Sequence, residues 1–200
     1  MQIPAHSSLT ASLVSADLSV TGVLGNQELR TVSGEVRTAA GHDVRVRTVS
    51  GDVRLTAGAG SRLVEIATVS GDVTVSGGAG ELEVNTVSGE GMLTVGTLTR
   101  AHVKTVSGDF SITADLAPDG RLEAESVSGD MKVIFAGALP PAVFDLQSFS
   151  GKLSTCFGQK AAREGYGPGS RPRLSFQEGA GSARVRIDTK SGDVSLCGKK

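Results

Sequence analysis

The sequence predicts an all-β fold, a single-stranded parallel β-helix in which one chain winds into stacked coils. The first observation is the phrase Thr-Val-Ser-Gly, which recurs in full five times and continues as Ser-Gly in the same phase. Copies roughly 20 residues apart are too short to bury a core alone, so neighbours must stack. The second observation is an apolar period of two on both sides of Ser-Gly, which is typical of strands with one buried face.

These observations predict one domain over residues 1–200, with about nine coils that each rise about 4.8 Å. We expect right-handed winding from the general preference of crossover connections. An antiparallel sandwich is the alternative fold, because turn signals also recur every 8–12 residues or so. A sandwich does not predict identical phrases in one phase, so the β-helix is favoured.

Each repeat is expected to hold two short strands. In the copy at 81–88, Leu82, Val84 and Thr86 alternate with residues predicted to face outward. A second strand follows the Ser-Gly, with inward residues such as Val73 and Val75. Glycine-rich turns then lead to the next repeat. In the copy with Glu90-Gly91-Met92-Leu93, one extra residue after the corner predicts a local bulge.

The alternation shifts by one residue at each Ser-Gly, which requires a corner where glycine supplies backbone angles that other residues resist. The predicted structural corners are Gly34, Gly51, Gly71, Gly89, Gly108, Gly129, Gly151 and Gly192.

Two columns of polar residues follow from the repeat. The acids after the corners could line up as divalent cation sites, but accepting hydrogen bonds from turn amides is the favoured interpretation. These acids are Asp17, Glu35, Asp52, Asp72, Glu90, Asp109, Asp130 and Asp193, and Lys152 interrupts them. The Thr and Ser that open each phrase are in phase with Leu82 and Val84. We therefore expect these hydroxyls to point inward and to bond along the column, rather than form an outward ice-binding array.

The regular spacing of the Ser-Gly phrases is interrupted between Ser150 and Ser191. Residues 158–173 are a loop by composition, predicted to be extruded from the penultimate coil, which resumes at Leu174-Ser175-Phe176. Exposed loops on rigid scaffolds often carry function, whereas a solvated or capping loop is the structural alternative. The residues of this possible recognition loop are Lys160, Arg163, Tyr166, Arg171 and Arg173.

The two cysteines occupy the same place in their repeats. Cys156 lies five residues after Gly151, and Cys197 lies five residues after Gly192. Because the gap between these repeats holds only one coil, we expect the two on adjacent rungs, close enough for a disulfide. The alternative is a pair of unbonded thiols. A disulfide would favour an oxidising compartment.

Composition and charge limit the function. A net charge of −1 gives no long-range attraction to nucleic acid. No apolar run approaches the roughly 20 residues of a membrane span, and no signal peptide is recognisable at the start. His6, His42 and His102 are far apart in the chain, and no nucleophile motif or metal-ligand spacing is present. We therefore expect no catalytic residues, no metal and no cofactor.

The phrase Thr-Val-Ser-Gly-Asp-Val at 48–53 and 68–73, with Gly-Ala-Gly turns at 58–60, 78–80 and 179–181, resembles a bacterial adhesin-type family of β-strand repeats. The likeness extends from about Leu9 to Cys197. The resemblance implies an exported or envelope-associated β-solenoid and carries over no catalytic residues.

The expected function is a non-catalytic structural or adhesion-type binding module of the cell envelope, periplasmic or on the cell surface. Its expected partner is an envelope protein or a polysaccharide. The alternatives are a β-helix enzyme that acts on polysaccharide and an accessory component of an envelope-stress system.

Overall fold

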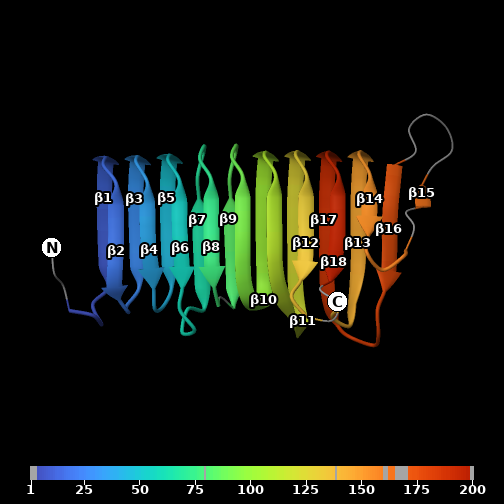
Figure 1. The fold of residues 1–200 in the computed structure, drawn as a ribbon, viewed down its shortest axis with the longest axis horizontal. Helices are drawn as coiled ribbons and strands as arrows, with labels where there is room; N and C mark the ends of the chain where they lie inside the picture. Colours follow the sequence, from blue (N-terminus) through green and yellow to red (C-terminus); the bar gives the residue numbers. More distant parts are fainter. Residues whose placement is uncertain (1–3, 79, 138, 160–161, 165–170, 199–200) are drawn as a thin grey trace.

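The computed structural model describes residues 4–78, 80–137, 139–159, 162–164 and 171–198 and shows a parallel β-solenoid (Figure 1). The predicted all-β class is confirmed. Each coil places one strand in each of two facing sheets and turns at Ser-Gly between them.

The strands divide between the sheets in alternation. The first sheet begins with β1 (Leu9–Ser15), β3 (Gln27–Ser33), β5 (Val44–Ser50), β7 (Leu63–Ala67) and β9 (Glu81–Asn85). The second sheet begins with β2 (Leu18–Val23), β4 (Val36–Ala40), β6 (Val53–Ala57) and β8 (Val73–Gly77). Two long strands, β10 (Gly91–Ser107) and β11 (Phe110–Ser128), run through both sheets. The chain ends with β12 (Met131–Phe135), β13 (Ala142–Ser150), β14 (Leu153–Thr155), β15 (Ala162–Glu164), β16 (Arg171–Gln177), β17 (Ala183–Ser191) and β18 (Val194–Gly198).

The core is the narrow space between the two sheets. Because strand side chains alternate, every second residue points inward, and Val44, Val64, Leu82 and Val84 are at most 1% exposed. Parallel pairing stacks equivalent residues in register, as in Val44 beside Val64 beside Leu82. Small aliphatic side chains therefore suffice to fill each layer, which accounts for the scarcity of large aromatic residues.

The corners require glycine for two reasons, and Gly89 shows both. Its φ is 127°, a region that side chains resist. A Cβ there would also lie 2.2 Å from the carbonyl oxygen of Gly71 one coil away. Gly151 is not among the positive-φ glycines, so only the second reason applies there. A Cβ at this position would lie 2.0 Å from the carbonyl oxygen of Gly192.

The expected bulge at Glu90–Leu93 is wrong. Gly91 and Met92 pair regularly with Val73 and Thr74, and the register of β10 shifts only beyond Thr94. Gly91 takes an inward position, where a Cβ would lie 2.0 Å from the ring of Phe110. The glycine thus leaves room for a large neighbour and does not mark an insertion.

The last repeats do not stack in sequence order. Strand β17 pairs in parallel with β11 on one side and with β13 on the other. Likewise β18 lies between β12 and β14. The chain therefore passes over one rung after β12 and returns to fill it last, as the dark red strands between yellow and orange show (Figure 1).

One expectation about this end is corrected by this order. Leu174–Phe176 does not resume the coil: β16 runs antiparallel to β13 and covers it, with the Phe176 and Phe144 rings stacked 4.7 Å apart. An antiparallel strand cannot continue a parallel stack, so the next repeat enters the rung left open beside β11. A chain that stacked in sequence order would leave its final repeat at the end with one neighbour, but here the final repeat has neighbours on both sides.

Of the predicted loop at 158–173, part lies outside the described residues. In the part that the structure describes, β15 pairs antiparallel with the beginning of β16.

Candidate functional site

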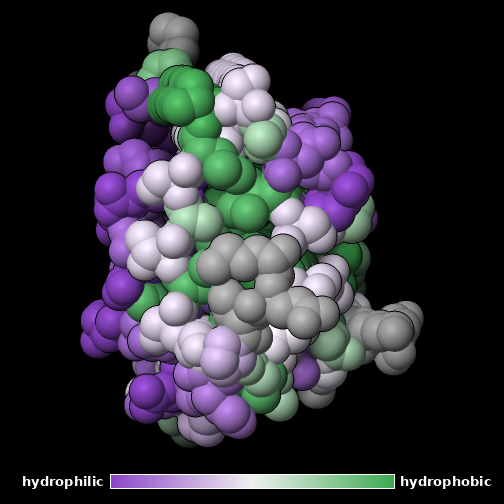
Figure 2. Space-filling view, turned by 90° about the vertical axis from the view of Figure 1, so that its left-hand side faces the viewer, coloured by the Kyte–Doolittle hydropathy of each residue, from purple (hydrophilic) through white to green (hydrophobic). Residues whose placement is uncertain are grey.

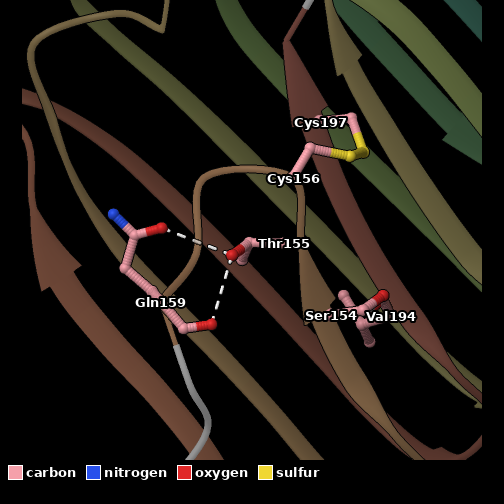
Figure 3. The surroundings of a disulfide bond; sticks show 6 residues. All are labelled: Ser154, Thr155, Cys156, Gln159, Val194 and Cys197. Atoms are coloured by element: carbon pink, nitrogen blue, oxygen red, sulfur yellow. Dashed lines mark hydrogen bonds between the residues drawn. A yellow bond between two sulfur atoms is a disulfide. The ribbon is translucent and has the colours of Figure 1, made fainter.

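A disulfide joins Cys156 and Cys197, whose Cα atoms are 5.0 Å apart (Figure 3). It links two neighbouring rungs that are separated by 41 residues in sequence. Ser154 Oγ also donates to the carbonyl oxygen of Val194 at 3.3 Å across these rungs, and Thr155 Oγ1 lies 3.3 Å from two oxygens of Gln159. By the chain-entropy model, a loop of this size corresponds to about 4 kcal/mol of stabilisation.

The corner acids form a hydrogen-bonded ladder. Asp72 Oδ1 accepts the backbone N–H of Glu90 at 2.9 Å, and Asp109 Oδ1 accepts that of Asp130 at 2.8 Å. Asp130 Oδ1 accepts the backbone N–H of Asp193, and Asp193 Oδ1 accepts that of Lys152, both at 2.8 Å. The corner aspartates thus hold the next coil, as favoured from the sequence, whereas Glu35 instead forms ion pairs with Arg37 and Arg54. Among the described residues, no group of three or more His, Cys, Asp or Glu side chains is placed to hold a metal ion.

The hydroxyl column points inward, as predicted, and Thr86 and Thr105 are 5% and 1% exposed. The expected bonding along the column is wrong, however. Thr86 Oγ1 donates to the carbonyl oxygen of Ser88 at 3.3 Å, around its own corner. Thr31 and Thr68 make the same bond around their corners. The hydroxyls of Thr48, Thr105, Ser126 and Thr189 have no hydrogen-bond partner in the described part of the chain. All of these residues are buried and face away from a ligand outside.

The residue after each of these hydroxyls faces outward and forms an exposed apolar row. Its valines are 41–73% exposed, although most outward positions of the sheets are polar. The row consists of Val32, Val49, Val69, Val87, Val106 and Val127, and Val14 takes the same place in the first coil after Leu13. Lys190 of β17 interrupts it, and Phe149 of β13 follows, 58% exposed. The run of exposed valines therefore ends at β17, the strand that is out of sequence order.

The expected recognition residues do not form one cluster in the described part of the chain. Lys160 and Tyr166 lie outside the described residues, as does the side chain of Arg163. Arg171 places its guanidinium 5.0 Å from the centre of the Phe149 ring. Arg173 grips both carboxylate oxygens of Asp145, at 3.0 and 3.1 Å. Both arginines therefore hold β16 against β13.

Surface grooves flank β17 along its length. One groove is lined by Arg121, Glu123, Val143, Asp145, Arg184 and Arg186. Further along the strand, a second groove toward β13 includes Phe149, Arg171 and Lys190, and a third toward β11 includes Lys104, Val127 and Lys190. We refer to this outer face over β11, β17 and β13 as the β17 surface.

Arg121 and Arg184 are the most distinctive residues of the β17 surface. They are exact register partners on adjacent strands, and both are exposed. Within the described part of the chain, neither makes a hydrogen bond or an ion pair. Like charges placed directly opposite each other normally destabilise a sheet. Two guanidinium groups side by side, with donors free of partners among the described residues, are an arrangement that can bind an anion.

Two of the acids nearby have arginine partners of their own. Asp145 is held by Arg173, at 3.0 Å. Arg186 donates to Asp188 at 2.9 Å, and this hydrogen bond raises the pKa of the Arg186 guanidinium. The lining of the groove thus includes three arginines, Arg121, Arg184 and Arg186, against two acids, Glu123 and Asp145.

Sequence reasoning missed this arginine pair. The two residues are 63 positions apart, and they become neighbours only because the last repeat inserts beside β11. Their equivalent places, one residue before the inward residues Leu122 and Val185, were the available signal. That signal required knowing which coils are adjacent.

The fold and its surface define a β-solenoid with a polar, grooved outer face. No helix in the described part of the chain has the length and apolarity that a membrane crossing needs. The chain belongs to the Toastrack DUF4097 family, a domain family of unknown function, whose model matches residues 1–197. No curated protein and no solved structure matches the chain.

Proposed function

We propose that this protein is a non-catalytic binding module of the bacterial cell envelope that holds an acidic polysaccharide on the β17 surface. The observation that carries the proposal is the exposed, unpaired and in-register pair Arg121 and Arg184. Arginine presents a planar fork of donors that matches a carboxylate or a sulfate oxygen pair. An anion bound between the two would also remove their mutual repulsion.

The shape of the surface supports an extended ligand. The grooves follow one another along β17, so a linear polymer can contact several of them. At the far groove, Phe149 offers an apolar ring and Lys190 a second cation. Exposed aromatic faces suit sugar rings, and multiple weak contacts along a polymer add in avidity. The row of exposed valines ends at this same place.

The envelope location rests on the disulfide between Cys156 and Cys197. Such bonds persist in oxidising compartments and are rare in the cytosol. A rigid solenoid that presents one long face also suits an envelope binding module, because neither a closed cleft nor a moving part is needed.

Calorimetric titration with polygalacturonate, and with neutral dextran as the comparison polymer, tests the proposal. The Arg121→Gln/Arg184→Gln double variant should bind the acidic polymer at least about tenfold more weakly, since charged hydrogen bonds contribute about 1.5–3 kcal/mol each. Raising the salt concentration should weaken wild-type binding as well.

The chain offers a matched control in Arg37 and Arg54. They are also register partners on adjacent strands, β4 and β6 of the second sheet. Both, however, form an ion pair with Glu35 in the corner before β4. The Arg37→Gln/Arg54→Gln variant should bind like the wild type. Equal losses in the two double variants, or equal binding of dextran and polygalacturonate, would contradict the proposal.

A further inference from the structure

The first coil leaves one hydrogen-bonding edge of the solenoid open. In the described part of the chain, β1 pairs only with β3, and β2 pairs only with β4. The inward residues Leu9 and Ala11 are only partly buried, whereas Leu29, the register partner of Ala11, is 0% exposed. Figure 2 looks onto this end and shows apolar surface between two polar flanks.

Edge strands are normally protected against pairing by charges, prolines, bulges or a covering segment. Strand β2 has such a device, because its register shifts between Val20 and Val23, at Gly22 with a φ of 75°. Strand β1 itself contains no charge, proline or bulge: its sequence is Leu-Thr-Ala-Ser-Leu-Val-Ser, and its register with β3 is regular. Neighbouring β3 and β5 both carry charged residues at their outward positions.

The opposite end of the first sheet is built differently. There, β16 covers β13 in antiparallel fashion, and only residues 171–173 of β16 pair with β15 on the other side. A head-to-tail stack of copies would have to displace this hairpin. In the described part of the chain, the β1 edge therefore presents a strand that continues the parallel stack, whereas the far end presents the antiparallel β16.

The sequence of β1 is suited to pair with itself. Residues 9–13 read the same in both directions in chemical character: Leu9 and Leu13 inward, Thr10 and Ser12 outward, with Ala11 at the centre. A twofold axis at Ala11 would place Leu9 against Leu13 of a second copy and Thr10 against its Ser12. This is the isologous contact that symmetric dimers use.

From this edge we infer that the protein forms a homodimer in which β1 of one copy pairs antiparallel with β1 of a second copy, end to end. The pairing satisfies the open backbone groups of both β1 strands and covers the partly exposed leucines. It leaves the β17 surface of each copy free at the far ends, so the inference does not depend on the polysaccharide proposal.

Sedimentation equilibrium of the full chain tests the dimer, and the expected mass is twice the 20.4 kDa of one chain. Thr10 and Ser12 are exposed, so charges can be introduced there without entering the core. The Thr10→Lys/Ser12→Lys variant would oppose like charges across the axis and should sediment as a monomer. A wild-type monomer throughout the micromolar range, or a dimer that survives this variant, would overturn the inference.

The Thr10→Lys/Ser12→Glu variant is the matched control. It carries the same number of introduced charges, but opposes Lys to Glu across the axis and should remain a dimer. Within one copy, its new charges also face Glu28 and Arg30 favourably, according to the register of β1 with β3. A monomer in this control would count against the proposed contact.

Cysteine mixing tests the register even if a charge variant fails to fold. Chains with Thr10→Cys and chains with Ser12→Cys, mixed and gently oxidised, should form a crosslinked dimer of one chain of each kind. Each variant alone should crosslink far less. Crosslinking that is equally efficient within a single variant would rule out the antiparallel register centred on Ala11.

Discussion

Single residues determine how closely the coils can stack. At most corners, the glycines of neighbouring coils lie so close that a Cβ on one would meet the backbone of the other, as at Gly89 and Gly71. The aspartate that follows accepts an amide of the next coil, as Asp72 does from Glu90. The Ser-Gly-Asp phrase is therefore a structural device, and its repetition gives no information about a ligand.

Glu65 is the residue whose charge can be tested most simply. Burial raises the pKa of its carboxyl group, but hydrogen bonds from Arg47 and Arg45 outweigh this effect, so the pKa is lowered from 4.5. A lowered pKa contributes stability above the unfolded value, and that stability is lost as the pH falls through the folded value. Glu65→Gln should thus cost up to about 1 kcal/mol at pH 7.

Urea unfolding of Glu65→Gln and wild type at pH 7 and at pH 3 measures the difference in their free energies of unfolding. This difference should be smaller at pH 3. Glu83, the register partner of Glu65, has no ion pair among the described residues. Glu83→Gln should therefore change the free energy of unfolding by no more than about 0.5 kcal/mol at either pH. A Glu65 effect that grows in acid would have the wrong sign for this account.

At the scale of one strand, alternation decides which side chains are inside. Val84 in β9 is 0% exposed, whereas Val87, in the corner that follows β9, is 46% exposed. Val84→Asp would place a charge between the two sheets and should lower the free energy of unfolding by about 3–5 kcal/mol. Val87→Asp, the same change three residues away, should cost no more than about 0.5 kcal/mol.

Thermal and urea unfolding of both variants checks this assignment. If the two changes cost the same, the inward and outward faces of the coil would be wrongly assigned.

Sequence alone predicted the strands and the corners well, because period two and the glycine phrase act within one repeat. It also placed Cys156 beside Cys197, because equivalent positions on adjacent rungs come close together. It failed at β16, whose Leu174 and Phe176 have the alternation of a coil strand but run antiparallel. Alternation is the same for both directions of a strand, so this pattern could not reveal the cap.

The candidate site was less predictable than the fold. The loop residues were chosen by composition, but Arg171 and Arg173 serve to hold β16 against β13. The pair Arg121 and Arg184 comes from repeats that are far apart in sequence. No local pattern could place them together, because their contact depends on a long-range choice of neighbouring strand.

At the scale of the whole molecule, the order of the rungs is the central feature. A simple spiral would place β13 directly beside β11 and leave the last repeat at the end. Instead the chain passes over one rung, closes the end with an antiparallel strand and fills the open rung last. The disulfide then joins the late repeat to its outer neighbour. The β17 surface exists only because of this order.

Engineered disulfides test this order directly. Glu125 of β11 and Asp188 of β17 are register partners, and Asp188 is in turn the partner of Gln147 in β13. Glu125 and Gln147 are thus two rungs, about 10 Å, apart, which is too far for a disulfide. Peptide mass mapping after oxidation should find a new bond in Glu125→Cys/Asp188→Cys and none in Glu125→Cys/Gln147→Cys. A bond in the second variant and none in the first would show that the repeats stack in sequence order.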